Sequence, residues 1–352
     1  MIERATEQYE RTKRVCRARK AAPWAALFAL ASSACASPRP SPPKWPISPP
    51  SALCHDPTLA EGDFCVPPEA ERWLSSSALR VTAAHETAGG STAPLKLRVE
   101  VPLHGSAPVA FSAKFKRVPD ALDEFNNSPR RELAAYELQK LFLDPHEYVV
   151  PATTMACLKV PDASHPLSKL KKVPGTDCVL GVLSYWVENV SAEDVRDRDL
   201  YRQNAAYRAS LGNAEILTTL IGHQDSLGDN VVRSTDPLRP RVLAVDNGLS
   251  LGALGKNPIR LISEGWNGTD VPLLPGRAVH RLRAIRRADL DALLVVAEMR
   301  RDGGTLVPSR DAVPVDPSEG VRRTADAMQF GLTKREIDGI ESRLGEILEL
   351  VP

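Results

Sequence analysis

The chain has 352 residues, 43% of them hydrophobic and 25% charged, which is enough apolar sequence for one large two-lobed domain or two small ones. Lys and Arg number 45 against 44 for Asp and Glu, so the formal net charge is +1. A balance this even argues against nucleic acid as the main partner, because phosphate binding needs a basic surplus. The composition also excludes the collagen-like and disordered classes.

The first 35 residues predict an export signal. Residues 11–20 are basic without an acid, and the apolar stretch 21–34 (AAPWAALFALASSA) ends in small residues. That stretch is too short to cross a bilayer, which takes about 20 apolar residues. Cleavage after Ala36, and cleavage before Cys35 with a lipid on its thiol, both remain open; the second resembles a bacterial lipoprotein signal. We therefore expect an exported protein of the periplasm or outer envelope, with Cys35 as the candidate membrane anchor.

A proline-rich segment and a cysteine-bearing extension follow the signal. Residues 36–52 contain SPRPSPPKWPISPPS, which predicts an extended tether of polyproline type. Residues 53–77 form an N-terminal extension that carries Cys54 and Cys65. With Cys157 and Cys178 these make an even number, typical of disulfides in an exported protein. Three connectivities are open, and we favour the local pairs, Cys54 with Cys65 and Cys157 with Cys178.

Residues 78–190 predict a strand-rich lobe with one key helix. Residues 95–101 alternate apolar and polar side chains, the period of a half-buried strand, and residues 109–116 predict a second strand. A helix follows over residues 132–142, with Ser128 as its cap and Pro129 in its first turn. Two further strands are expected near residues 148–159 and 178–189, where a disulfide between Cys157 and Cys178 would join the hairpin.

Residues 191–352 predict a helical lobe. Helices are expected over residues 192–211, 213–222 and 287–301. The last helix begins with the capping box of Thr333 and Glu336, and its apolar residues fall on one stripe. The fold class expected from both halves is α+β with two lobes, a strand-rich N-terminal lobe followed by a helical C-terminal lobe.

Two polar signals in the first lobe are typical of phosphate binding. Gly89, Gly90, Ser91 and Thr92 lie between predicted strands, where backbone N–H groups can approach phosphate oxygens. Lys116 ends a strand, and Glu132 at the start of the next helix is its candidate partner. The alternatives are an ordinary hairpin turn for the first signal, and for the second a solvated lysine with a glutamate that complements the helix dipole.

Two more polar signals lie in the second lobe. Apolar residues flank a polar loop that presents Asp225 and, five residues later, Asn230, a carboxylate and an amide at the spacing of a kinase catalytic loop. The apolar residues 242–245 are followed by Asp246, which could chelate a metal, and then by Asn247 and Gly248. An Asx-rich turn is the alternative for the loop. For the second signal it is a type I′ hairpin at Asn-Gly.

The order of these signals resembles a known family. "DSLGDN" followed by "AVDNGLSLG" is similar to the atypical kinases of the phosphatidylinositol 3-/4-kinase-like group, above all type II phosphatidylinositol 4-kinases, their bacterial relatives and the secretory-pathway protein kinases. "KFK" and "RELAAYELQKLF" match that group's lysine strand and glutamate helix. The sequence departs from the pattern at Gln224 and Ser226, and it lacks an Ala-Pro-Glu segment.

The resemblance implies a two-lobed protein-kinase-like fold that uses ATP and Mg²⁺. It implies Lys116 as the nucleotide lysine, Glu132 as its partner, Asp225 as the catalytic base, and Asn230 and Asp246 as metal ligands. The expected function is an exported phosphotransferase acting on a hydroxyl acceptor, a protein more than a lipid, because no apolar insertion resembles a membrane-binding loop. The alternatives are a catalytically silent pseudokinase that serves as an envelope binding module, and a structural lipoprotein without a small-molecule site.

Overall fold

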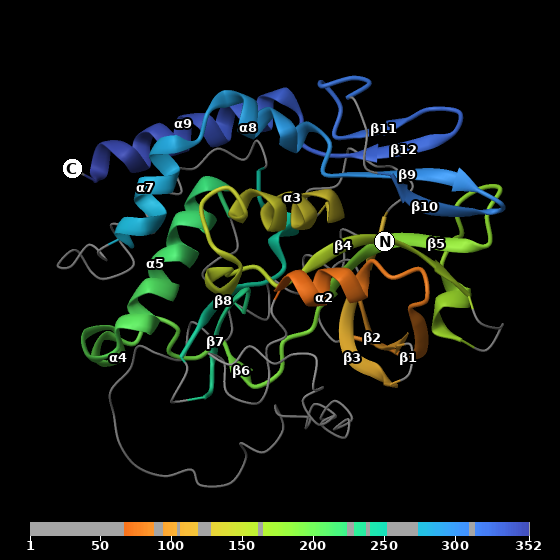
Figure 1. Ribbon diagram of the computed structural model, residues 1–352, viewed down its shortest axis with the longest axis horizontal. Helices are drawn as coiled ribbons and strands as arrows, with labels where there is room; N and C mark the ends of the chain where they lie inside the picture. The colour runs from red at the N-terminus through yellow and green to blue at the C-terminus, as the bar shows by residue number, and fades with distance from the viewer. Residues whose placement is uncertain are drawn as a thin grey trace, which may run out of the picture. The chain divides into compact units, whose positions relative to one another are not determined.

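The N-terminal part of the described chain is built on one antiparallel sheet (Figure 1). The computed structural model describes residues 67–87, 94–103, 106–118, 128–160, 165–223, 229–236, 240–251, 274–309 and 314–351. Five strands lie in the order β1-β2-β3-β5-β4. Their bounds are β1 (Arg80–Glu86), β2 (Leu95–Leu103), β3 (Ser106–Arg117), β4 (Thr153–Lys159) and β5 (Cys178–Tyr185). The predicted α+β class, with its strands first, is confirmed.

Strand β2 shows why these residues form a sheet. Leu95, Leu97 and Val99 are buried, whereas the intervening Lys96 and Arg98 are partly exposed. This alternation with a period of two is that of a strand with one face on the core. Strand β3 runs antiparallel to β2, with Leu95 opposite Phe115.

Two helices pack against this sheet from opposite faces. Helix α2 (Pro67–Leu74) lies on the face of Phe111, whose ring centroid is 5.9 Å from that of Trp73. Helix α3 (Pro129–Gln139), the predicted key helix, contacts β4 and β5 and lies on the face that carries Lys116. Ser128 occupies the N-cap position as expected, but its side chain makes no capping hydrogen bond. Its backbone N–H instead donates to the Gly248 carbonyl at 3.2 Å, which ties α3 to a distant turn.

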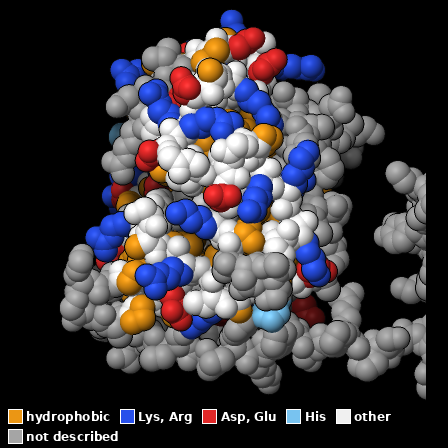
Figure 2. All heavy atoms as spheres, turned by 90° about the vertical axis from the view of Figure 1, so that its right-hand side faces the viewer, with side chains coloured by type: hydrophobic (Ala, Val, Ile, Leu, Met, Phe, Trp, Pro, Cys, Tyr) orange, Lys and Arg blue, Asp and Glu red, His pale blue; other side chains and the backbone are white. Residues whose placement is uncertain are grey.

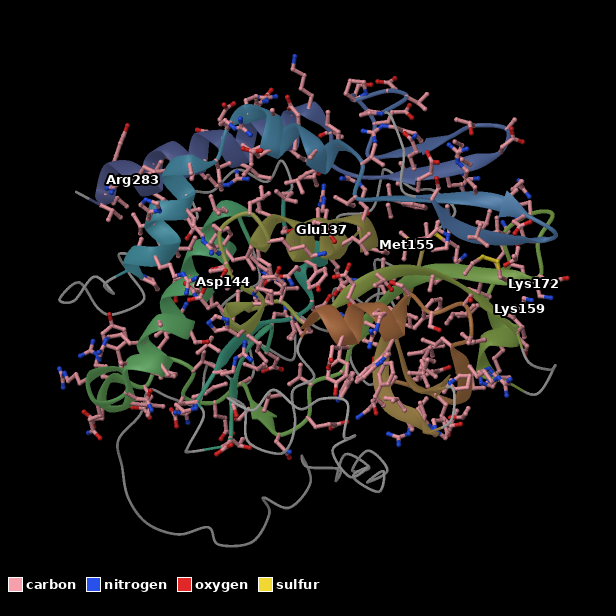
Figure 3. The ribbon with its side chains drawn as sticks, in the orientation of Figure 1. Glu137, Asp144, Met155, Lys159, Lys172 and Arg283 are labelled. Carbon is pink, nitrogen blue, oxygen red and sulfur yellow. A yellow bond between two sulfur atoms is a disulfide. The ribbon has the colours of Figure 1, made fainter. Side chains whose placement is uncertain are left out.

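A disulfide joins strands β4 and β5. Cys157 pairs with Cys178 as predicted, and the bond lies near Lys172 in Figure 3. Leu180 is the register partner of Cys157, so the crosslink runs diagonally across the antiparallel pair. The second predicted pair, Cys54 with Cys65, lies outside the described residues, as do the predicted export signal, the candidate anchor Cys35 and the tether.

Replacing Cys157 and Cys178 together by serine is expected to lower the free energy of unfolding by about 3 kcal/mol. The two cysteines are 21 residues apart, so the bond closes a loop and reduces the freedom of the unfolded chain. Urea denaturation of the double variant beside the wild type measures the difference. Equal midpoints and slopes for the two proteins would contradict the expectation.

Helices dominate the next part of the chain. They are α4 (Arg198–Gln203), α5 (Ala205–Leu220), α7 (Gly276–Ala284), α8 (Arg287–Asp291) and α9 (Lys334–Leu350). The predicted helix over residues 192–211 is wrong in its bounds, because the Asn204 side chain accepts a hydrogen bond from the Tyr207 N–H at 2.9 Å and starts α5 there. The capping box of Thr333 and Glu336 at the start of α9 is confirmed.

A four-stranded sheet in the C-terminal part was not predicted. The chain forms α8 and a short 3₁₀ turn instead of one helix over residues 287–301, and then strand β9 (Ala297–Asp302). Gly303 and Gly304, both at positive φ, form a two-residue hairpin into β10 (Thr305–Ser309). Strands β11 (Val321–Arg323) and β12 (Ala327–Phe330) complete the order β10-β9-β12-β11. The β-branched Val295 and Val296 and the Gly-Gly pair were the missed signals.

The two larger sheets share an apolar seam. Met155 and Val182 of the first sheet pack with Met299 and Phe330 of the second, and Leu133 of α3 joins them. Met155 is labelled in this region of Figure 3, between α3 and β9. A third sheet, in the order β6-β7-β8, consists of β6 (Val190–Ser191), β7 (Val231–Ser234) and β8 (Val242–Ala244). Among the described residues, no helix combines the length and apolar character needed to cross a bilayer.

Candidate functional site

Lys116 projects from β3 toward α3. Side chains alternate along a strand, so Phe115 enters the core while Lys114 and Lys116 share the opposite face. Lys116 is 1% exposed, which is unusual for a lysine. Strand β5 approaches closely here, because a Cβ added to Gly181 would lie 2.4 Å from the Phe115 ring and 2.7 Å from the Lys116 carbonyl. Glycine at position 181 therefore permits the packing that places Lys116.

Glu132, in the first turn of α3, meets the Lys116 ammonium. The Nζ of Lys116 donates to Glu132 Oε1 at 2.7 Å, and both groups are buried. This is the strand-lysine and helix-glutamate pairing expected from the sequence. The alternative of a solvated lysine is excluded by the burial of Lys116.

Asp246 reaches the same ammonium from a segment 130 residues away. Its Oδ1 lies 3.0 Å from Lys116 Nζ. Asp246 has φ 54° and ψ 53°, a left-handed conformation uncommon for residues other than glycine. A 3₁₀ turn over Asn247–Leu249 follows it, and neither Asn247 nor Gly248 has a positive φ. The alternative of a type I′ hairpin at Asn247 and Gly248, which needs positive φ at both, is therefore wrong.

Lys114 is a fourth member of the cluster, and the sequence patterns did not identify it. Its Nζ lies 3.0 Å from Asp246 Oδ1 and 3.5 Å from Glu132 Oε2. The signal that could have found it is the spacing in Lys114-Phe115-Lys116, which puts both lysines on one face of the strand. The cluster therefore contains two ammonium groups and two carboxylates.

The cluster is electrostatically balanced. Burial opposes the charge on Lys116, but Glu132 and Asp246 more than offset it, so the pKa of Lys116 lies above its ordinary value. Burial likewise opposes the charge on Asp246, and the neighbouring Lys114 and Lys116 outweigh it and hold the pKa of Asp246 below its usual range. Lys116 and Asp246 are therefore both charged near neutral pH.

Of the other predicted site residues, the structure describes Asn230 but not the predicted catalytic base or phosphate loop. The Asn230 carbonyl accepts a hydrogen bond from the Val245 N–H at 2.8 Å, so pairing of β7 with β8 brings Asn230 beside the residue that precedes Asp246. Asp225 lies outside the described residues, as do Gly89, Gly90, Ser91 and Thr92. Their predicted roles, as catalytic base and phosphate loop, remain predictions.

The donors around Asp246 suit a hard cation. The Asp246 side chain is 33% exposed, so its carboxylate can be reached from solvent, and Asn230 lies at the end of the neighbouring strand. Carboxylate and amide oxygens are the ligands that Mg²⁺ takes in proteins. The Asp246 carboxylate therefore fits the expected metal, and the role of Asn230 as a second ligand remains a prediction.

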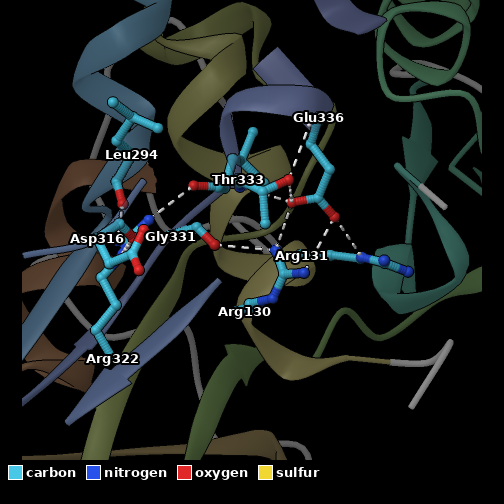
Figure 4. Close-up of polar contacts among 9 residues, drawn as sticks. Arg130, Arg131, Leu294, Asp316, Arg322, Gly331, Thr333 and Glu336 are labelled. Carbon is cyan, nitrogen blue, oxygen red and sulfur yellow. Dashed lines mark hydrogen bonds and ion pairs between the residues drawn. The ribbon is translucent and has the colours of Figure 1, made fainter. Parts of the chain in front are cut away.

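Helix α3 is held in place by the start of α9 (Figure 4). Arg130, two residues before Glu132, donates to Glu336 Oε2 at 2.7 Å and to the Gly331 carbonyl at 2.9 Å. Arg131 donates to Glu336 Oε1 at 3.1 Å. Arg130 and Glu336 are 6% and 8% exposed, so this is a buried ion pair. The pair fixes the end of α3 that carries Glu132.

Glu336→Gln is expected to destabilise the protein by about 3–5 kcal/mol, because it leaves two guanidinium groups without their carboxylate. Glu341→Gln on the same helix is the matched control. It removes an exposed pair with Arg287, which is worth about 0–1 kcal/mol. Chemical denaturation of both variants measures the losses, and equal losses would contradict a buried clamp.

The loss at Glu336 should also depend on pH. Burial would raise the pKa of Glu336, but the hydrogen bond and charge of Arg130 outweigh it and lower the pKa. The ionised group therefore contributes stability above the unfolded-state pKa of about 4.3, and this contribution is lost as the pH falls through the lower folded-state pKa. Denaturation curves between neutral and acid pH should show the wild type and Glu336→Gln converging below about pH 4. A constant gap would contradict this assignment.

Two surface hollows in the described part of the chain have no predicted site residue in their lining. One of about 130 Å³ is lined by Lys171, Lys172 and Arg323, and a neighbouring one of about 90 Å³ by Arg301 and Arg323. Figure 2 shows the side of the molecule where β9 ends and β10 begins, with Lys and Arg side chains interspersed among Asp and Glu. Lys172 is 47% exposed and lies 3.8 Å from Asp177. Lys172 is thus a solvated charge at the surface.

Comparison with known proteins gives structural likeness alone. No protein-family model and no curated protein matches the chain. A crystal structure of the Golgi casein kinase aligns over 80% of this chain and 75% of its own length, at 12% identity and a TM-score of 0.44. The same kinase with Mn/ADP bound aligns over 80% of this chain and 74% of its own length, at 13% identity and a TM-score of 0.46. A MAP kinase from Leishmania major aligns over 79% of this chain and 82% of its own length, at 12% identity and a TM-score of 0.29. Fold likeness assigns no function, so the function of this chain has to be inferred from the geometry of its site.

Proposed function

We propose that this chain is an exported phosphotransferase of atypical kinase type, which transfers a phosphoryl group from Mg–ATP to a hydroxyl acceptor. One observation carries the proposal. The buried Lys116 ammonium lies 2.7 Å from Glu132 on a helix and 3.0 Å from Asp246 after a strand. A nucleotide lysine, its orienting glutamate and a metal-binding aspartate are the parts that phosphoryl transfer needs in one place.

Each residue has a distinct task in the proposed reaction. Lys116, oriented by Glu132, binds phosphate oxygens of the nucleotide. Asp246 and Asn230 would hold the metal, which would supply positive charge to neutralise the phosphates of the nucleotide. Asp225 accepts the proton of the acceptor hydroxyl while the hydroxyl oxygen forms a bond to the γ-phosphorus. The bond between the γ-phosphorus and the oxygen that links it to the β-phosphate breaks in the same step. Backbone N–H groups of the loop at Gly89, Gly90, Ser91 and Thr92 would bind the phosphates.

Export and the class of acceptor are part of the proposal. The basic and apolar N-terminal residues, the small residues around Cys35 and the proline-rich tether support a protein held at a cell envelope. A protein hydroxyl is favoured over a lipid, since the sequence has no apolar insertion that resembles a membrane-binding loop.

Two alanine variants test the function. Asp225→Ala is expected to keep stabilisation by Mg–ATP and to lose transfer by about 10²- to 10⁴-fold, because it removes a general base. Asp246→Ala should weaken Mg–ATP binding itself, because it removes a metal ligand. Labelled ATP with a panel of acceptors measures transfer, and thermal shift measures binding. Asp199→Ala, which removes an 82% exposed carboxylate on α4, is the matched control and should change neither. Equal ATP consumption by the wild type and both site variants would overturn the assignment.

A pseudokinase that serves as an envelope binding module is the second candidate. The observation that favours it is that the Asp246 carboxylate already lies within 3.0 Å of two ammonium groups, so the cluster is charge-balanced without a metal. Titration with Mg–ATP discriminates, because a specific ligand at 100 times its Kd stabilises the fold by about 2.7 kcal/mol. No shift in unfolding temperature would favour the binding module.

A further inference from the structure

Lys114 has no part in the proposed function, yet it contacts the same carboxylate oxygen as Lys116. Both Nζ atoms lie 3.0 Å from Asp246 Oδ1. Two ammonium groups on one oxygen repel each other, and this arrangement is compensated by the negative charge of Asp246 and Glu132. Lys116 alone would suffice to bind phosphate next to the metal. The second lysine therefore needs its own explanation.

The two lysines are held differently. Lys116 is 1% exposed and bonded to Glu132 at 2.7 Å, so it is fixed in the interior. Lys114 is 15% exposed, and its distance to Glu132 is 3.5 Å. Asp246, at 33% exposed, is the most accessible of the four side chains in the cluster. Lys114 is thus the outer ammonium, and its flexible four-carbon stem can carry it to another partner.

A divalent cation cannot bind at Asp246 while both lysines keep their contacts with that carboxylate. A metal bound at Asp246 Oδ1 would meet two ammonium groups at contact distance from the same oxygen, and like charges this close disfavour binding. If the metal arrives with a triphosphate, the phosphate oxygens offer the displaced ammonium a new anionic partner.

We propose that Lys114 is an exchangeable phosphate-binding residue, which occupies Asp246 when the site is empty and moves to the phosphates of a nucleotide when the metal–nucleotide complex binds. This inference rests on the proposed function. Its consequence is that metal and nucleotide each favour binding of the other. The metal alone has to compete with Lys114 for Asp246, and the nucleotide alone binds without the metal at its phosphates. The site then discriminates against free divalent cations.

Binding of Mn²⁺ with and without ATP tests the proposal on the whole protein. Mn²⁺ is paramagnetic, so electron paramagnetic resonance of the free ion gives its Kd directly, with no activity readout. Lys114→Met keeps the length of the side chain and removes the charge. We expect it to bind Mn²⁺ alone about tenfold more tightly than the wild type and to lose a similar factor in affinity for Mn–ATP.

Lys96→Met is the matched control. Lys96 is the cross-strand partner of Lys114 on β2, is 14% exposed, and pairs with Glu188 at 2.9 Å instead of with the cluster. Its loss should leave both Mn²⁺ affinities unchanged. Lys114→Arg, which keeps the charge, should retain most of the affinity for Mn–ATP. The unfolding temperature without ligand shows whether each variant folds.

The outcomes separate this inference from the proposed function. If the wild type binds no Mn–ATP, the proposed function itself fails. If the wild type binds Mn–ATP and Lys114→Met binds Mn²⁺ and Mn–ATP as the wild type does, the role of Lys114 is overturned while the function stands. Weaker binding of Mn²⁺ alone by Lys114→Met would also overturn it, because a charge that merely supports the fold of the site would act in that direction.

Discussion

The ammonium group of Lys116 sets the main constraint on this structure. Removing a charged group from water costs several kcal/mol, and the cost is offset only when opposite charges lie at hydrogen-bond distance. Lys116 is 1% exposed, so Glu132 and Asp246 must reach it, one from the first turn of α3 and one from the turn after β8. The sheet, the helix and the distant turn are therefore tied together at one point.

Other contacts fix the two elements that carry the carboxylates. The Ser128 N–H donates to the Gly248 carbonyl, so the start of α3 is joined directly to the turn that holds Asp246. Arg130 and Arg131 join the same end of α3 to Glu336 of α9. Because α3 is held from two sides next to Glu132, the distance between Glu132 and Lys116 depends on residues near the C-terminal end of the chain.

The charge count of the cluster links structure to the proposed chemistry. Two lysines and two carboxylates balance in the structure, with Lys114 and Lys116 sharing one oxygen of Asp246. A cation beside the carboxylates and a polyanion beside the ammonium groups would each meet opposite charge, whereas either one alone would also face like charge without compensation. The proposed metal–nucleotide ligand is consistent with this arrangement of charges.

Local patterns in the sequence determined a large part of the fold. Alternation along residues 95–101 and 109–116, the capping box at Thr333 and the helix after Pro129 all identify elements that the structure contains. The local pairing of Cys157 with Cys178 was also within reach, because the two residues flank one hairpin. Periodicity and caps are properties of neighbouring residues, so they can be identified without knowledge of what packs against them.

Tertiary structure alone decided which faces meet and which charges are compensated. The second sheet was missed because β9 and β12 are short and stable mainly through their pairing and the seam with Met155 and Val182. Nothing in its local sequence distinguishes Lys114 from an ordinary strand lysine, because its contact with Asp246 joins distant parts of the chain. Arg130 and Glu336 are separated by 206 residues. A charged or polar residue type shows that the side chain needs a partner when it is buried. Packing between distant segments determines which residue that partner is, and local sequence patterns carry no information about such packing.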